Sequence, residues 1–381
     1  MSEEAQSPMT LLYTEVEEEL RAAVRSLLTD RSSPSAVLAH VESAATTGAV
    51  PYDMELWKAL GRDIGAAGLL IPEDLGGAGA SAREAAVVLE ELGRAVAPVP
   101  YLSSAVLATR ALLGARDEAA RELLGRLASG EVTAALAVSF AASPYTPPHP
   151  AVTLGADGTL TGRVTGVIGA EVADVLIVPV SAEGGDPALY AVDASAARIK
   201  TVASLDLTRP IATVSFSEAR ARPVGSVAGV ADALLLAAGL LASEQLGVAE
   251  WCLSTTVAYV KERKQFARPV GSFQAIKHRL ADLWLEVVGA RAAARNAAAL
   301  LGAGEDAGVA VAVGVAQAHC GTVAVHAAEE CIQLHGGIGM TWEHPAHLYL
   351  KRAKADEIAL GTPGDHRDAL ATLADLPGPV S

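Results

Sequence analysis

The stretch CIQLHGGIGMTWEHPAHLYLKRAKADEIALGTPGDHR, residues 331–367, predicts a helix, a glycine corner, a second helix and a turn at residues 361–364. The adjacent Gly336 and Gly337 would let the backbone approach a ligand closely, and free amide groups there can face a diphosphate. The same pair also suits a plain helix C-cap. Leu360 stands just before the second turn and offers neither an acid nor a base.

Composition sets outer limits on the kind of protein. The chain has 381 residues, enough for two or three domains, and 51% hydrophobic against 19% charged residues suits large buried surfaces such as subunit contacts. A net charge of −15 makes nucleic acid an unsuitable partner. The three cysteines, Cys252, Cys320 and Cys331, lack paired spacing, so we expect buried reduced thiols in a cytoplasmic protein.

Two segments bear on targeting. Residues 1–10 are acidic and polar and contain no apolar signal segment. The apolar run at residues 229–251 is interrupted by Asp232 and Glu244, so we expect a buried helix and no membrane span.

The hydrophobic period changes twice along the chain. It is helical over residues 10–130, with capping boxes at Thr14–Glu17 and Ser81–Glu84, alternates over 132–218, and is helical again from 226. Asp157-Gly158 predicts a hairpin within the alternating part. We therefore predict an α+β, mostly α fold with three parts: a helical domain (1–130), an antiparallel β domain (131–222) and a helical bundle (223–381). This order excludes alternating βαβ units.

A second corner lies at RKQFARPVGSFQAIKHRLADL, residues 263–283. A guanidinium (Arg263), a ring (Phe266) and an amide (Gln274) meet where one helix ends and another begins, with Ser272 as the expected cap of the second helix. These groups suit a ligand with phosphates and a flat ring, because Arg forms bidentate charge-assisted bonds. The alternative is a helix–helix corner whose Arg pairs with a carboxylate.

Together these stretches resemble the acyl-CoA dehydrogenase family. WKALGRDIGAAGLLIPEDLGGAGAS (57–81) resembles its N-terminal helical domain, residues 263–283 its flavin-binding helix pair, and QLHGGIGMTWEHPAHLYLKRAK (333–354) its C-terminal flavin loop. The resemblance covers nearly the whole chain in the family order. It implies an N-terminal helical domain, a β domain, a C-terminal four-helix bundle, and FAD bound across a subunit interface.

The resemblance also implies which residues contact FAD. Those expected from one subunit, on the diphosphate and adenine side, are Arg263, Phe266 and Gln274. Those expected from the partner subunit are Gln333, Gly336 and Gly337. Thr362 is expected near the adenosine pyrophosphate.

The implied reaction is α,β-dehydrogenation of an acyl-CoA thioester, in which a carboxylate removes the α-proton and flavin accepts the β-hydride. The commonest family position for this base holds Leu360, and the alternative position holds Ala237. Glu244 lies seven residues further on the same helix face, so it is either a relocated base or an ordinary buried glutamate. The catalytic residue therefore stays unknown.

The β domain departs from the family pattern as well. Residues 137–150, AVSFAASPYTPPHP, lack the expected acid-proline pair, and Val167 stands where the family has an aromatic residue beside the flavin ring. Phe140 or Tyr145 are possible substitutes. Ring contacts from this chain are therefore in question.

Four histidines lie in or near the C-terminal motifs. His335 either donates to FAD or is a packed helix-end residue, and the resemblance places it near the flavin. His344, His347 and His366 lack the spacing of a metal site, so we expect exposed or capping residues and no metal.

Three hypotheses follow. The chain is either the base-lacking subunit of a heterotetrameric dehydrogenase of fatty-acid or steroid side-chain catabolism, a self-sufficient homotetramer with Glu244 as base, or a scaffold without a redox role. An acyl-CoA substrate and an electron-transferring flavoprotein as acceptor are what the family resemblance implies.

Overall fold

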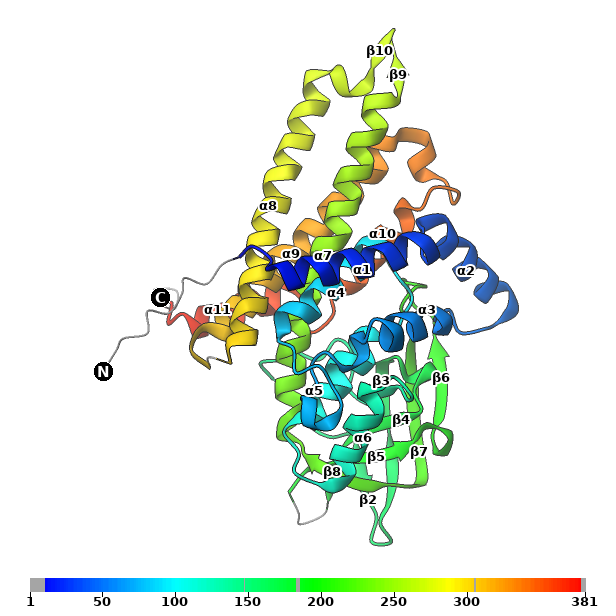
Figure 1. Cartoon of the computed structure of the whole chain (residues 1–381), viewed down its shortest axis with the longest axis vertical. Coiled ribbons are helices and arrows are strands. Elements are labelled where there is room, and N and C mark those ends of the chain that lie inside the picture. Colours follow the sequence, from blue (N-terminus) through cyan, green and yellow to red (C-terminus); the bar gives the residue numbers. More distant parts are fainter. Residues whose placement is uncertain (1–10, 147, 183–185, 305, 378–381) are drawn as a thin grey trace.

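The computed structural model describes residues 11–146, 148–182, 186–304 and 306–377, so the prediction for residues 1–10 lies outside it. The long helices of the C-terminal part form one half of the molecule, and the β-sheet forms the other together with N-terminal helices that lie beside it (Figure 1). The predicted order of helices, strands and helices is confirmed. The domain boundaries at 130 and 222 stay predictions, and the last strand of the large sheet runs on to Ser226.

The first helical part begins where its sequence provides capping groups. Both predicted capping boxes form: Thr14 with Glu17, and Ser81 with Glu84. A π-helix, η4 (Tyr101–Ala108), leads into α5. The α-helices of this part are α1 (Glu15–Arg31), α2 (Pro34–Thr47), α3 (Met54–Lys58), α4 (Ala82–Ala95), α5 (Thr109–Leu113) and α6 (Glu118–Ala128).

The described residues form a sheet of eight strands with the order β6-β7-β3-β2-β4-β5-β8, and β1 also pairs with β4. The predicted hairpin joins β2 and β3 antiparallel. The strands are β1 (Ala134–Leu136), β2 (Val152–Leu154), β3 (Thr159–Ile168), β4 (Val175–Ala182), β5 (Ala188–Asp193), β6 (Arg198–Val202), β7 (Ile211–Arg220) and β8 (Arg222–Ser226).

The prediction of a purely antiparallel domain was wrong in one respect. Both β1 and β2 run parallel to β4, so the sheet is mixed. Turn residues fix the direction of consecutive strands such as β2 and β3, but these parallel partners are separated by other segments, and no local signal sets their direction.

The second helical part is the bundle. The described residues show α7 (Ala228–Glu262), α8 (Gln274–Ala303), α9 (Asp306–His335), α10 (Ala346–Glu357) and α11 (Pro363–Leu373). A short hairpin of β9 (Lys264–Gln265) and β10 (Arg268–Pro269) tops the α7–α8 connection (Figure 1). Helix α7 and residues 308–340 are long and apolar enough to cross a membrane, but both are mostly buried inside the fold, which is typical of core helices.

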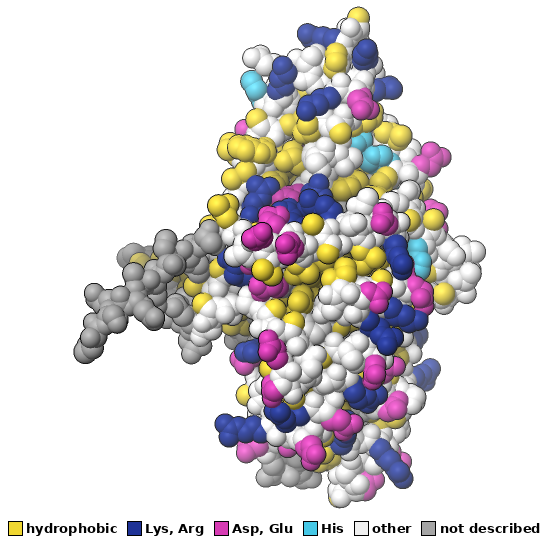
Figure 2. Space-filling model, in the orientation of Figure 1, with side chains coloured by type: hydrophobic (Ala, Val, Ile, Leu, Met, Phe, Trp, Pro, Cys, Tyr) yellow, Lys and Arg dark blue, Asp and Glu magenta, His cyan; other side chains and the backbone are white. Residues whose placement is uncertain are grey.

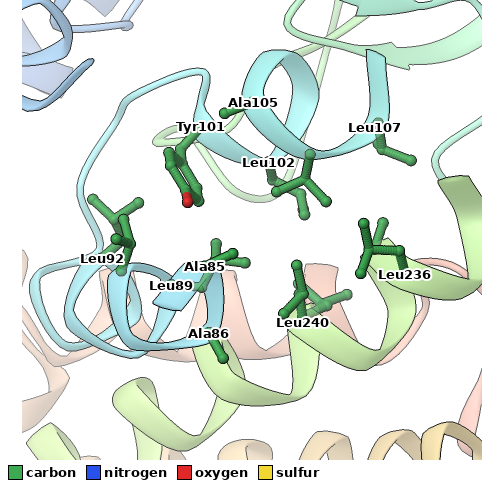
Figure 3. Close-up of a cluster of buried hydrophobic side chains, with 14 of the residues drawn as sticks. Ala85, Ala86, Leu89, Leu92, Tyr101, Leu102, Ala105, Leu107, Leu236 and Leu240 are labelled. Atoms are coloured by element: carbon green, nitrogen blue, oxygen red, sulfur yellow. The ribbon is translucent and has the colours of Figure 1, made fainter. Parts of the chain in front are cut away.

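One apolar core joins the two helical parts. It includes residues of α4, η4 and α7, and Figure 3 shows Leu89, Tyr101, Leu102 and Leu240 pointing toward one another from these three elements. A smaller core lies within the sheet. The large core therefore fixes the N-terminal helices on the bundle.

Two glycines let α4 and α7 cross in close contact. A Cβ added at Gly93 would lie 2.1 Å from the carbonyl oxygen of Glu244, and one at Gly247 would lie 1.9 Å from that of Glu90. No side chain fits at either position, so the crossing depends on both glycines.

An aromatic stack fixes α10 on α7. The rings of Trp251 and Tyr349 lie 3.5 Å apart at 4°, and the Tyr349 hydroxyl donates to the carbonyl oxygen of Arg94 at 2.9 Å. On the surface, hydrophobic side chains gather over the helical half in the view of Figure 2, while the sheet half is mostly charged and polar. The exposed ones in the bundle include Phe266, Trp284, Leu285, Met340 and Trp342.

Candidate functional site

The ends of α7 and α9 meet at one corner of the bundle. The two helices pack side by side and run in the same direction, because α8 returns the chain from the end of α7 to the start of α9. Their C-terminal ends therefore lie at the same end of the bundle. A hollow of about 390 Å³ opens there, and we call it the α7–α9 corner. Its lining residues are Tyr259, Arg263, Gln265, Val270, Leu334, His335, Gly336, Gly337 and Ile338.

The backbone of Arg263 is hydrogen-bonded at both its N–H and its carbonyl, whereas its side chain points to solvent. Its N–H donates to the carbonyl oxygen of Tyr259 at 2.8 Å, and its own carbonyl accepts from Val270 at 2.7 Å. The guanidinium is exposed, and no carboxylate of the described residues pairs with it. The alternative of a structural ion pair at this corner therefore does not hold within one chain.

Gly336 and Gly337 present open backbone to the same hollow. Gly336 has φ +64, a conformation that side chains disfavour, and a Cβ added to either glycine would meet nothing within 4 Å. The peptide groups are thus accessible to a ligand, as the sequence predicted.

Three further predicted residues surround the hollow without lining it. Phe266 is 86% exposed at the tip of the β9–β10 hairpin, with φ +51, and its ring meets that of Phe273 edge-on at 6.2 Å. Gln274 is exposed at the first position of α8, and Gln333 is exposed on the last turn of α9. The predicted cap was wrong: the Ser272 hydroxyl donates to the carbonyl oxygen of Pro269 instead of capping α8.

Within one chain, Arg263 and the glycine pair line the same hollow, because α7 and α9 run parallel. The expectation that they contact one FAD from different subunits stays a prediction. Thr362 does not join them. Pro363 beside it lies 3.7 Å from a Cβ built on Gly321, and residues 321 to 336 of α9 span about 22 Å.

The turn at Leu360–Thr362 is closed. The side chain of Leu360, at the commonest family position for the base, is fully buried in the apolar core. Its φ is +55, and its N–H donates to the carbonyl oxygen of Phe140 at 2.7 Å. The Thr362 hydroxyl caps α11 with Asp365.

The loop after β1 packs on this turn. Besides the Phe140 carbonyl, the Tyr145 hydroxyl lies 3.1 Å from Nδ1 of His366. We expected His366 to be exposed or capping, but it is completely buried. Val167 is buried in the core of the sheet. Both proposed aromatic substitutes thus contact the turn region.

Five charged residues form a buried ion cluster beneath the turn, between α7, α10 and the β6–β7 loop. Its members are Asp206, Arg209, Glu244, Arg352 and Asp356. Arg209 and Arg352 both bond to Oε1 of Glu244. Arg209 also contacts Asp356 at 2.6 Å, and Arg352 contacts Asp206 at 2.5 Å.

Three carboxylates share two guanidiniums in this cluster, so one carboxyl lacks a full counter-charge. Burial, followed by the charge of Glu244, raises the pKa of Asp356 to about 8. Its Oδ2 has no hydrogen-bond partner and can carry a proton. Burial opposes ionisation of Asp206 too, but Arg352 and Arg209 outweigh it and hold its pKa below the ordinary value.

This geometry counts against Glu244 as a base. Its side chain is fully buried, and one oxygen is held by two arginines. Its other oxygen has no partner but is equally buried. A base must lie within hydrogen-bond reach of the proton that it removes, and Glu244 lines none of the described hollows.

Comparison with known proteins agrees with the fold. Family models for the acyl-CoA dehydrogenase N-terminal and C-terminal domains match residues 14–131 and 229–373. The chain is 36% identical to acyl-CoA dehydrogenase IpdE2 of Mycobacterium tuberculosis over 344 residues, which cover 90% of this chain and 92% of the relative. This chain belongs to the acyl-CoA dehydrogenase family.

Two solved structures extend the comparison. A variant of the Tcur3481-Tcur3483 steroid ACAD aligns with TM-score 0.83 and 29% identity, covering 96% of this chain and 99% of the other. A chain of the ChsE4-ChsE5 complex from Mycobacterium tuberculosis aligns with TM-score 0.83 and 29% identity, covering 97% and 100%. As an acyl-CoA dehydrogenase, the chain is a FAD-dependent oxidoreductase of the acyl-CoA class.

The α7–α9 corner has groups that fit part of FAD. An unpaired guanidinium and open glycine backbone suit a diphosphate, and an exposed ring stands at the rim. Sequence reasoning missed Tyr259 and Gln265, although Tyr259 precedes Arg263 by one helical turn. It also missed Arg209 in the stretch SLDLTRPI, where two charges stand in apolar surroundings.

Proposed function

We propose that this chain is the base-lacking subunit of a heteromeric acyl-CoA dehydrogenase. It binds the diphosphate and adenine side of FAD, while a related partner chain supplies the catalytic base and the contacts to the flavin ring. The residues assigned to FAD are Arg263, Phe266, Gln274, Gln333, Gly336, Gly337 and Thr362. Thr362 belongs to a different part of the assembly from the other six.

The residues of this chain bind and orient the cofactor. Bound FAD supplies the acceptor for the β-hydride of the acyl group. Arg263 gives charge-assisted bonds to the diphosphate, the Gly336-Gly337 backbone lets it approach closely, and Phe266 offers a ring face to the adenine. The exposed hairpin and glycine corner leave this part of the site open to a partner subunit.

The observation that carries the proposal is the closed turn. The two family positions hold Leu360 and Ala237, which are buried and apolar, and the relocated candidate Glu244 is held by Arg209 and Arg352, so none of the three provides a base that reaches an acyl chain. The corner in the same chain is exposed and has groups for FAD. A chain with an open cofactor end and a closed reaction end fits a partner that completes the reaction.

Similar proteins suggest the substrate class. The names of the Tcur3481-Tcur3483 steroid ACAD and the ChsE4-ChsE5 complex each refer to two different polypeptides, and both structures align with nearly the whole length of this chain. We therefore propose a steroid side-chain or fatty acyl-CoA substrate, a cytoplasmic location, and an electron-transferring flavoprotein as acceptor.

The test is co-purification. The chain is purified alone and together with the dehydrogenase-like chain encoded next to it, and flavin absorbance and acyl-CoA dehydrogenation are measured. The proposal expects flavin and activity only in the two-chain preparation. In that preparation, Glu244→Gln should lower the activity only as far as it destabilises the fold. Activity of the chain alone that Glu244→Gln abolishes, while folding is retained, would establish the self-sufficient enzyme. Absence of flavin from both preparations would favour the scaffold.

A further inference from the structure

The ring of His335 is fixed on several sides at the α7–α9 corner. It stacks on Tyr259 with centroids 4.4 Å apart, and His344 lies against it at 4.3 Å and 46°. Its Nδ1 lies 2.6 Å from the carbonyl oxygen of Cys331, one helical turn earlier. The imidazole is therefore held in one orientation before any ligand binds.

These contacts decide which atom faces the hollow. A carbonyl oxygen only accepts, so Nδ1 carries a proton and donates to Cys331. The ring lines the hollow although the residue is only 3% exposed, so Nε2 is the polar atom left for a ligand. Nε2 donates a hydrogen bond only when the ring is protonated.

The surroundings favour the protonated ring. Burial alone would lower the pKa of His335, but hydrogen bonds to the thiol and the carbonyl of Cys331 raise it above its ordinary value. The Cys331 thiol, 3.7 Å from Nδ1, has its own pKa lowered by a hydrogen bond from Cys252, against burial, with help from His335 and Thr256. Both shifts favour a proton on the ring rather than on the thiol.

The other titratable groups around the ring come from the end of α7 and from the segment before α10. Tyr259 of α7 stacks on the ring, and Arg263, which follows α7 directly, lines the same hollow. Before α10, His344 touches the ring, and burial followed by the charge of His335 lowers the pKa of His344. The lowered pKa of His344 disfavours a second charge beside the ring, and Arg263 is the one arginine or lysine that lines the hollow among the described residues.

We propose that His335 is a cofactor-positioning residue whose protonated ring donates from Nε2 to a diphosphate oxygen of the dinucleotide in the α7–α9 corner. It acts beside Arg263 and aligns the diphosphate over the glycine backbone. The inference rests on the cofactor part of the proposed function. It adds a pH dependence of cofactor affinity that Arg263, charged throughout, does not provide.

The test measures the Kd for FAD from about pH 5.5 to about pH 8.5, a range that brackets an ordinary imidazole. Apoprotein is prepared from the holoprotein, with the partner chain present where flavin binding requires it. For the wild type we expect affinity to fall roughly tenfold as the pH rises through the pKa of His335. His335→Phe, which keeps the ring stack, should bind FAD roughly tenfold to a hundredfold more weakly at the acidic end and show no pH dependence.

Two conservative variants separate this role from a structural one. His335→Gln provides a neutral donor near Nε2, so it should recover part of the affinity without the pH dependence. Cys331→Ala removes the thiol beneath the ring, so the midpoint of the wild-type pH profile should move to lower pH while affinity at the acidic end is kept. A loss of folding alone would not produce either pattern.

Arg263→Ala separates the inference about His335 from the assignment of the cofactor site. If it weakens FAD binding while the wild type and His335→Phe share one pH profile, the inference about His335 is wrong and the cofactor site stands. If neither Arg263→Ala nor His335→Phe changes the Kd, the cofactor does not bind at this corner, and both the inference and the site assignment fail.

Discussion

The α7–α9 corner and the Leu360 turn lie at different levels of one bundle and are built in opposite ways. At the corner, Arg263 is exposed and unpaired within the described chain, and Gly336 has open space beside it. At the turn, Leu360 is buried, and Glu244 and Arg352 beneath it are paired and fully enclosed.

The difference shows how one fold separates binding from chemistry. Charged groups that bind a ligand must stay accessible, and such groups cost little stability when exposed. Charged groups that are enclosed must satisfy one another, and they then serve packing instead of catalysis. This division between accessible binding groups and enclosed structural groups can be tested by substituting a residue of either kind beside a matched control.

The largest expected effect lies in the enclosed cluster. Arg352→Met would leave Asp206, Glu244 and Thr208 without their shared donor, so we expect the free energy of unfolding to fall by about 3–5 kcal/mol. Urea denaturation of the purified protein measures this. Arg121→Met, which removes an exposed ion pair to Asp74, should change it by less than about 0.5 kcal/mol. Equal losses of unfolding free energy in both variants would mean that the buried cluster contributes no more to stability than an exposed ion pair does.

Removal of the accessible guanidinium should affect binding instead of stability. Arg263→Ala should weaken FAD binding by about 1.5–3 kcal/mol, because a charge-assisted phosphate contact is lost. Its free energy of unfolding should stay within about 0.5 kcal/mol of the wild type. Flavin titration of the two-chain preparation measures the first, and urea denaturation of this chain the second, with the exposed neighbour Lys264→Ala as control. Unchanged flavin affinity would remove Arg263 from the site.

The third prediction concerns pH. The carboxyl of Asp356 has a folded-state pKa of about 8 against the ordinary 3.8, so the folded protein holds a proton that the unfolded chain releases. Its contribution therefore makes the free energy of unfolding fall as pH rises from about 4 to about 8, and leaves it level above that. Between pH 6 and pH 7 the fall should be about 1 kcal/mol.

Asp356→Asn should remove that fall, because the amide does not titrate. Urea denaturation at several pH values compares this variant with Asp74→Asn, a change at an exposed carboxylate that should keep the wild-type slope. A wild-type slope retained in Asp356→Asn would assign the proton to another group.

The smallest expected effect is at the hairpin tip. Phe266→Ala should leave the free energy of unfolding within about 0.5 kcal/mol, because the ring is 86% exposed. It should weaken FAD binding by about 0.5–1.5 kcal/mol through loss of ring stacking. Isothermal titration with FAD measures this, and Phe266→Tyr should restore the affinity. A large loss of stability would show that the ring packs in the protein rather than on the ligand.

Local chemistry made much of the fold predictable. Thr14 with Glu17 and Ser81 with Glu84 form their caps within four residues, and Asp157-Gly158 forms its hairpin. The parallel pairing of β1 and β2 with β4 was not predictable, since distant segments meet there. The ends of regular elements are encoded nearby, whereas strand direction in a mixed sheet depends on the whole chain.

The site divides in the same way. Arg263, Gly336 and Gly337 were found because each sits in a short motif, and the structure brings them together. The ion cluster was missed because its members are far apart in sequence: Asp206 and Arg352, for example, are separated by 146 positions. No local pattern shows that such charges enclose one another, and only the packing of α7, α10 and the β6–β7 loop reveals it.

The stack of Trp251 on Tyr349 gives the protein an internal optical reporter. The two rings lie 3.5 Å apart across the α7–α10 contact, close to the enclosed charges, so Tyr349 passes its excitation to Trp251 when α10 is docked. Separation of α10 from α7 would expose the indole of Trp251 to water and shift its emission to longer wavelength. Trp284 and Trp342 are already exposed and would change little, but the buried Trp57 would also respond to unfolding, so the shift reports this one contact once Trp57 is replaced by Phe.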